Sequence, residues 1–146
     1  MEKVLLIFVL AGTICLSVDV GYAVAVRYEL LNVEDAAAMA GALQIKMVPD
    51  SWDRWGRPNH WIPEIDETLA KRKSEQTFHR NLQQKPILRD VTLHSVLYEK
   101  VSRNRFLIDA RAEVPLPLTS KFLQSLGYPG IAPWPFHVRS TGGFDS

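Results

Sequence analysis

VLLIFVLAGTICLSVDVGYAVAV, residues 4–26, is the stretch that decides the fold, and RYELLNVEDAAAMAGA, residues 27–42, continues it. The first part holds one charged residue and is long enough to cross a membrane, which takes roughly 20 apolar residues. Along the second part, apolar side chains recur at the 4-3-4-3 spacing of a helical stripe: Val26, Leu30, Val33, Ala37 and Ala40. The sequence therefore predicts one continuous helix from about Glu2 to about Met47, on the order of 65–70 Å long. We expect a membrane span over about residues 4–26 and an extramembrane continuation to residue 47.

The same stretch resembles a known family. SVDVGY at residues 17–22, followed by RYELLNVEDAAAMAGA, is similar to the N-terminal region of TadE/TadG-like pilus-assembly proteins. Those proteins show a hydrophobic helix, a VDVG step, an Arg, and then LQNAADAAALAGA. The resemblance implies a structural, pseudopilin-like component of the tight-adherence (Tad/Flp) pilus or of its inner-membrane assembly apparatus. It also implies a cytoplasmic N-terminus, an extracytoplasmic C-terminal domain, and other pilin-like subunits or copies of the chain as partners.

Composition narrows the class of protein. The 146 residues leave room for one membrane helix and one small domain. Basic and acidic residues nearly balance, 17 against 16, so there is no basic field that would favour nucleic acid, and we expect no nucleic-acid partner. Cys15 is the only thiol and lies inside the apolar run, which excludes an intramolecular disulfide.

A secretory signal peptide is the alternative interpretation of the N-terminus. Residues 4–16 have the length of its apolar core, and residues 23–25, Ala-Val-Ala, have the small-x-small form of a cleavage site. Against cleavage, Lys3 is offset by Glu2 and the helical pattern passes through the cut unbroken, so we expect the helix to be retained. Members of the family usually carry basic residues, and often a prepilin peptidase site, before the hydrophobic run, so leader processing stays open. Lys3 and Arg27 flank the span almost equally, and only the resemblance gives an orientation.

Two features of the helix predict packing. Asp19 either lies at the outer membrane interface or pairs with a charge or terminal amine of a partner subunit. The alanine cluster at 36–42 lets helix backbones approach closely, against the chain's own sheet, another subunit, or both; the plain alternative is that alanine is simply the best helix former. The predicted helix-packing residues are Asp19, Gly21, Ala36, Ala37, Ala40 and Gly41.

Residues 48–63 are predicted to form a loop in which Pro49 ends the helix. It is rich in Trp and Arg, the usual anchors of interfaces, which can also stack on sugars or other rings. The alternative is that the loop folds back and buries its Trp rings as part of the core. The candidate interface residues are Trp52, Arg54, Trp55, Arg57, His60 and Trp61.

Residues 64–146 are predicted to form a small α+β domain. Its first element is a helix over residues 64–82, with Pro63 as a start signal. The period then switches to that of strands: Val91, Leu93, Ser95 and Leu97 share one face, and Phe106, Ile108, Ala110, Ala112 and Val114 share the next. A short helix follows over residues 120–126 with Thr119 as its N-cap, and residues 136–140 form a third strand at an edge. The fold class is therefore α+β: a long N-terminal helix, an antiparallel sheet of about three strands, and one or two short helices.

The C-terminal half also resembles TadE-like proteins. Ala112-Glu113-Val114-Pro115 matches their strand closing on VP, and residues 122–128 match their short helix ending in LG. We find no catalytic or metal-binding pattern, because the four His are scattered and there is no nucleophile elbow or phosphate loop. We therefore expect no enzyme activity, no metal and no cofactor. Two competing classes stay open: an anchored or secreted binding module that holds a glycan or peptide with the Trp/Arg loop, and a small extracytoplasmic enzyme whose site the sequence does not reveal.

Overall fold

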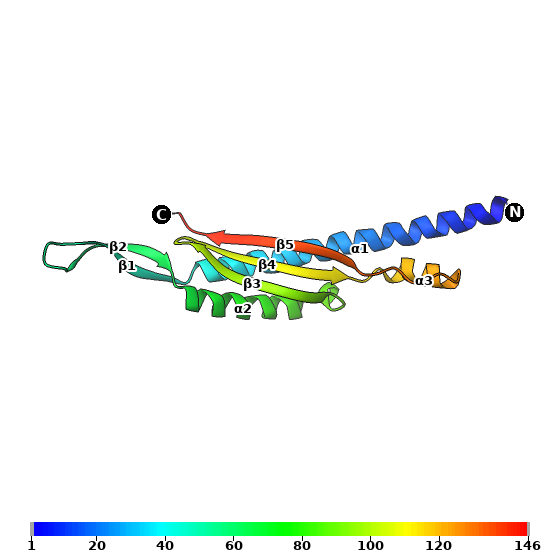
Figure 1. The fold of residues 1–146 in the computed structure, drawn as a ribbon. Coiled ribbons are helices and arrows are strands. Elements are labelled where there is room, and N and C mark those ends of the chain that lie inside the picture. Colours follow the sequence, from blue (N-terminus) through cyan, green and yellow to red (C-terminus); the bar gives the residue numbers. More distant parts are fainter. Residues whose placement is uncertain (1, 146) are drawn as a thin grey trace.

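A computed structural model describes residues 2–145, and one long helix runs through most of its length. Helix α1 spans Glu2–Ala42, and its N-terminus lies at one end of an elongated molecule (Figure 1). A three-stranded sheet and one helix pack along its C-terminal half, a shorter helix lies beside its N-terminal half, and a two-stranded hairpin extends past its C-terminal end (Figure 1). The predicted α+β class, with a long apolar helix followed by small antiparallel sheets and shorter helices, is confirmed.

Helix α1 ends at Ala42, five residues before the predicted end at Met47. The chain turns at Leu43, whose backbone N–H donates to the Met39 carbonyl, and the Gln44 side chain donates to the Ala40 carbonyl. Strand β1, Ile45–Trp52, begins at once. The prediction continued the helix over these residues. In the structure they pair with a second strand, which satisfies their backbone N–H and C=O groups in an extended conformation.

The predicted loop over residues 48–63 is wrong, because most of it is a β-hairpin. Strand β1 pairs antiparallel with β2, Pro58–Ile65, from Ile45 opposite Ile65 to Trp52 opposite Pro58. Three prolines lie in these strands, which the sequence rules treat as strand breakers. A two-stranded ribbon has only edge strands, so a missing N–H can face outward, and the register shifts on either side of Ser51 absorb further irregularity.

Helix α2 spans Glu67–Gln84 and starts after Asp66, not at Pro63, which belongs to β2. The Asp66 carboxylate accepts a hydrogen bond from the Leu69 backbone N–H and so caps the helix. Its narrow buried stripe consists of Ala70, Ser74, Thr77 and Phe78. A short 3-10 turn, η1 at Pro86–Leu88, leads to the sheet.

The three-stranded sheet has the order β3-β4-β5 and is antiparallel throughout. Its strands are β3, Thr92–Ser102; β4, Arg105–Val114; and β5, Trp134–Gly143. The predicted edge position of the last strand is confirmed, and Pro135 fits there. The predicted shared face of Leu93, Ser95 and Leu97 is wrong, because a bulge between Leu93 and Ser95 shifts the alternation and turns Val96 and Tyr98 inward.

Helices α1 and α2 pack on the sheet and against each other. The predicted stripe of α1 forms the centre of the core: Val26, Leu30, Val33 and Ala37 are fully buried, and Ala40 is half-buried. From the sheet, Phe106, Ile108 and Val114 of β4 meet this stripe, and Phe78 of α2 closes one side. Each Å² of apolar surface removed from water stabilises the fold by about 25 cal/mol, so burial of this stripe holds the domain on one face of α1.

Small residues let the elements approach closely where α1 passes under the sheet and α2. A Cβ added to Gly142 would come 2.4 Å from the Ala38 carbonyl oxygen, and one added to Gly41 would come 2.7 Å from the Phe106 ring. The Ser74 hydroxyl donates to the Ala37 carbonyl oxygen at 2.9 Å. The alanine cluster therefore serves packing within the chain.

Two adjacent alanines test this packing. Ala37 is fully buried and Ala36 is exposed, although the two are the same residue type at adjacent positions. We expect Ala37→Leu to lower the free energy of unfolding by about 1–3 kcal/mol, because the added carbons have no space. Ala36→Leu should change it by less than about 0.5 kcal/mol. Urea unfolding in detergent, followed by circular dichroism, measures both; equal effects would contradict the assignment of the buried face.

Candidate functional site

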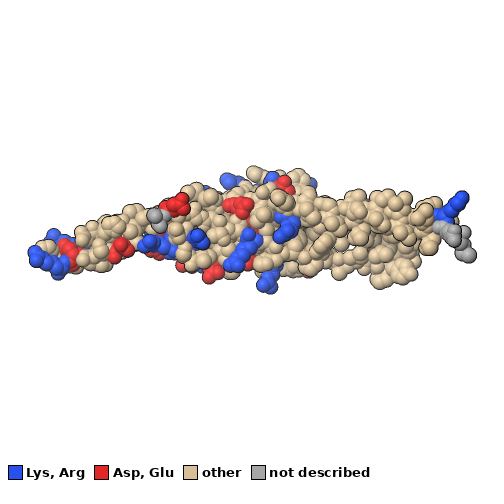
Figure 2. All heavy atoms as spheres, turned by 90° about the horizontal axis from the view of Figure 1, so that it is seen from above, with Lys and Arg blue, Asp and Glu red and all other residues tan. Residues whose placement is uncertain are grey.

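The N-terminal half of α1 has large apolar side chains that nothing in the described chain covers. Most of them, from Val4 to Val18, are exposed. Within residues 2–145, α1 is the one helix long and apolar enough to cross a membrane. On the face that Figure 2 shows, charged side chains gather over the sheet domain and the hairpin, whereas the surface toward the N-terminal end of α1 is almost free of them until the tip.

Asp19 is buried in this apolar region and has a partner inside the chain. Helix α3, Pro117–Ser125, lies beside α1 with its N-terminus at Asp19. The two carboxylate oxygens accept hydrogen bonds from the backbone N–H groups of Thr119, at 2.6 Å, and Leu118, at 3.3 Å. A carboxylate placed there satisfies two helix-end donors and meets the positive end of the helix dipole.

This contact corrects two predictions. Helix α3 begins at Pro117, not at residue 120, and its N-cap residue is Leu116, whose side chain makes no capping bond. Thr119 lies inside the helix and donates its backbone N–H to Asp19. The role of cap is taken by a residue 100 positions away. Asp19 was expected either at the outer membrane interface or paired with a charge or terminal amine of a partner subunit; the structure replaces the second expectation, because the carboxylate is bound by the chain's own α3.

The six predicted helix-packing residues separate into two groups. Asp19, Ala37 and Gly41 face α3, α2 and the sheet, and Ala40 is half-buried. Gly21 and Ala36 are exposed, and a Cβ at Gly21 would meet nothing within 4 Å. The first group holds this fold together. The second group has no partner of its own chain among the described residues.

Gly21 lies on an outward stripe of α1 that continues at helical spacing. Apart from the adjacent pair Val24 and Ala25, its exposed residues recur three or four positions apart, and the last of them lies just past the helix end: Gly21, Val24, Ala25, Tyr28, Asn32, Ala36, Met39 and Leu43. Val24, Tyr28 and Met39 are about half or more exposed. This outward stripe combines small residues with apolar ones, which is the composition of helix–helix contact surfaces in membranes.

The tip of the β1–β2 hairpin carries the predicted Trp/Arg interface residues. Trp52, Trp55 and Trp61 are 59%, 67% and 49% exposed, so the alternative in which their rings form core is wrong. The Asp53 carboxylate accepts from the backbone N–H groups of Trp55 and Arg57 and fixes the turn, and Gly56 supplies its positive φ of 74°.

Charged groups line the same tip. The Arg54 guanidinium lies 4.1 Å from the centre of the Trp55 ring, a cation–π distance. His60 lies 3.6 Å from Asp50 across the hairpin. The structure thus places the six predicted residues on one projecting hairpin, with their aromatic rings open to solvent (Figure 1).

Sequence analysis missed a second buried acid, Glu34. It is fully buried between α1 and the sheet, and neither carboxylate oxygen has a hydrogen-bond partner among the described residues. Burial raises its pKa to about 8, and repulsion from Asp109 and Asp35 adds to the rise, while the nearby Ala110 backbone N–H opposes it only in part. The signal was present in the pattern, because Glu34 lies four residues after Leu30 and four before Ala38 on the buried face.

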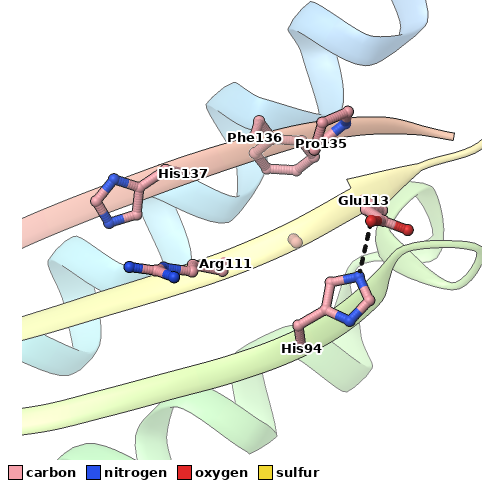
Figure 3. A pocket seen from close by; sticks show the side chains of 7 residues that line it. His94, Arg111, Glu113, Pro135, Phe136 and His137 are labelled. Carbon is pink, nitrogen blue, oxygen red and sulfur yellow. Dashed lines mark ion pairs between the residues drawn. The ribbon is translucent and has the colours of Figure 1, made fainter.

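An open hollow of about 560 Å³ lies on the outer side of the sheet (Figure 3). Each of its His side chains is paired with a carboxylate: His94 with Glu113 at 3.2 Å, and His137 with Asp109 at 2.6 Å. Arg111 projects beside His137 (Figure 3). The hollow is open to solvent, and no cluster of three or more potential metal ligands occurs within residues 2–145.

The chain matches no protein-family model, no curated protein and no solved structure. Its function therefore has to be argued from its own geometry. Two features stand out: uncovered apolar surface at the N-terminal end of α1, and exposed Trp rings at the opposite end of the molecule (Figure 1).

Removal of the Asp19 carboxylate should loosen α3. We expect Asp19→Ala to lower the free energy of unfolding by about 1–2 kcal/mol, as loss of a helix cap does, and to speed amide hydrogen exchange in residues 117–125. Asp19→Asn keeps one acceptor oxygen and should show a smaller effect. Hydrogen–deuterium exchange read by mass spectrometry measures both, with the distant β1–β2 hairpin as an internal control. Unchanged exchange in α3 would show that the cap contributes nothing.

Glu34 should make the fold less stable as the pH rises. The unfolded chain has a Glu pKa near 4.5 and the folded chain one of about 8, so between these values the folded state holds the extra proton. The stabilisation is complete below about pH 4.5, declines as the pH rises, and is lost above about pH 8. Glu34→Gln is neutral at every pH and should remove this decline.

Urea unfolding at several pH values measures the slope for both variants. Glu29→Gln is the matched control, because Glu29 is also on α1 but its pKa is lowered by the Lys85 ion pair at 2.8 Å. Its removal should leave the decline between pH 4.5 and 8 in place. Asp35, Asp109 and Tyr98 also face this region and are the same in both proteins, so the difference between the Glu34 variant and the native chain isolates one carboxyl.

Proposed function

We propose that this chain is a structural, membrane-anchored subunit of the pseudopilin kind, which works in a Tad/Flp-type pilus or in its inner-membrane assembly apparatus by helix packing. The observation that carries the proposal is the division of α1 along its length. Its second half is clamped by the chain's own domain, and its first half leaves its large apolar side chains uncovered. The resemblance of residues 17–22 and 27–42 to TadE/TadG-like proteins supports the same function.

Each half of α1 has its own task in this proposal. The uncovered half sits in the inner membrane, or in the core of a filament when the subunit is incorporated, because either environment removes apolar side chains from water. The outward stripe from Gly21 to Leu43 provides the contact for neighbouring pilin-like subunits or further copies. The sheet domain and the hairpin then stand on the extracytoplasmic side, as the resemblance implies.

A second function is favoured by the hairpin. Three exposed Trp rings and two Arg side chains on one ribbon can bind a glycan or a peptide, since Trp and Arg contribute most to many interfaces. In this alternative the protein is an extracytoplasmic binding module, either anchored by α1 or released by cleavage near Ala25. The structural role is preferred, because cleavage there would separate Asp19 from α3 and expose the core around Val26.

Gly21 offers a graded test of helix packing. A Cβ at this position meets nothing within 4 Å, so both Gly21→Ala and Gly21→Leu should fold. We expect Ala to preserve self-association and Leu to reduce it several-fold, because only the larger side chain holds a neighbouring helix away. Pull-down of an untagged copy by a tagged one, from detergent-solubilised membranes, measures the association.

The same preparation separates the two functions. Recovery of the whole chain only with detergent, together with reduced association of the Leu variant, supports the structural subunit. Equal association of all variants would rule out the Gly21 face as the contact. A soluble, monomeric product cut near Ala25 would favour the binding module instead.

A further inference from the structure

Helix α3 lies beside the part of α1 that we propose to be in the membrane. A Cβ added to Gly12 would come 2.9 Å from the Phe122 ring, and Asp19 caps the N-terminal end of α3. From Asp19, α3 therefore runs back along α1 toward the N-terminus of the chain (Figure 1). After a turn the chain returns to the sheet at Trp134, which shares a groove with Val24 and Arg27.

The rise of a helix sets the depth of these contacts. Val4 is the first residue after the charged Lys3, and Gly12 and Asp19 lie about 12 Å and 22 Å further along α1. The hydrocarbon core of a bilayer is about 30 Å thick. With Val4 at one boundary, Gly12 is close to the middle, Asp19 is still inside the core, and only the region of Arg27 lies beyond it. An α3 that contacts Gly12 and Asp19 cannot stay in water.

The side chains of this segment suit that environment. Between Glu113 and Arg139 the sequence holds one Lys, Lys121, and no carboxylate. Its exposed large apolar and aromatic side chains are Leu118, Leu126, Tyr128, Ile131 and Trp134, and the exposed long polar side chains of α3 are Lys121 and Gln124. The apolar stem of Lys121 can lie along this surface, and Trp134 suits the membrane–water boundary, which Trp residues favour.

At both ends of α3, backbone N–H groups have hydrogen-bond partners within the chain. An unpaired backbone N–H in hydrocarbon costs several kcal/mol. At the N-terminus of α3, Asp19 accepts from Leu118 and Thr119. At its C-terminus, where Gly127 takes a φ of 83°, the N–H groups of residues 126, 127 and 128 all donate to carbonyls of the last turn. Pro129 and Pro133 in the following turn have no N–H to satisfy.

We propose that α3 and the turn after it form a second membrane-inserted element, which enters the lipid leaflet on the sheet-domain side and returns to the boundary at Trp134. The occupant of its apolar surface is lipid, because the surface is continuous with the uncovered part of α1 and lies at the same depth. This inference rests on the proposed anchoring of α1, but not on any role in a pilus. It also gives Asp19 a role: its carboxylate pairs with backbone N–H groups at the start of α3, which would otherwise be unpaired within the apolar part of the bilayer.

Depth-dependent quenching of Trp fluorescence tests the proposal. The full chain is reconstituted in phosphatidylcholine–phosphatidylglycerol vesicles that carry bromine either near the headgroup or near the end of the acyl chain. Three single-Trp proteins are compared, with the other native Trp residues changed to Phe. One keeps Trp134, one keeps Trp55 at the hairpin tip, and one carries Tyr128→Trp as its only Trp. All these positions are largely exposed, so the fold should tolerate the changes, and near-native circular dichroism confirms it.

We expect the Tyr128→Trp probe to be quenched several-fold more by deep bromine than Trp134, which should respond more to shallow bromine. Trp55 should not be quenched by either. A protein that floats with the vesicles but leaves Tyr128→Trp unquenched overturns this inference and leaves the anchoring by α1 intact. If the unquenched probe is also shielded from water in a concentration-dependent way, a second copy covers the surface instead. A protein that fails to float overturns the anchoring itself, and this inference with it.

Discussion

The structure depends on one helix, α1, whose two halves lie in different environments. Over its second half α1 presents a stripe of Val, Leu and Ala to the sheet and to α2, and burial of that stripe removes the largest block of apolar surface from water. Over its first half the same helix has only α3 beside it, and from Val4 onward, apart from Thr13, Ser17 and the capping Asp19, its side chains are apolar or small on all sides. A helix that is apolar all round needs a non-aqueous environment or protein partners. The domain, the proposed anchoring and the proposed assembly all follow from this division.

The elements that the sequence predicted well depend on periodicity over many residues. The stripe from Val26 to Ala37 repeats for several turns and ends up buried, and the alternation in β4 places Phe106, Ile108 and Val114 inward. The predictions that failed depend on a few residues or on a distant partner. Helix α1 ends at Ala42 because β2, about twenty residues later, offers a strand to pair with. The bulge after Leu93 shifts the strand register by one residue, so the residues that follow it face the opposite side of the sheet.

The candidate sites show the same difference between features set by local sequence and features set by a distant partner. The exposure of the hairpin Trp residues was one of two alternatives in the sequence, and only the fold decides between them, because composition does not show which surface is nearby. Asp19 was recognised as unusual, but its partner lies 100 residues away and no local pattern connects them. Glu34 was overlooked because mixed charges on a helix usually face water, and its position on the buried face shows only when the helix is wound.

The bond between Asp19 and Thr119 has a mechanical consequence. The domain grips α1 near Ala38, through Gly142, and again at Asp19, about 28 Å away along the axis. Two attachment points that far apart prevent the domain from rotating about a single contact. A sideways force on the hairpin therefore tilts the whole of α1. The chain therefore acts as a rigid strut, in which a force on the hairpin also moves the uncovered N-terminal end of α1.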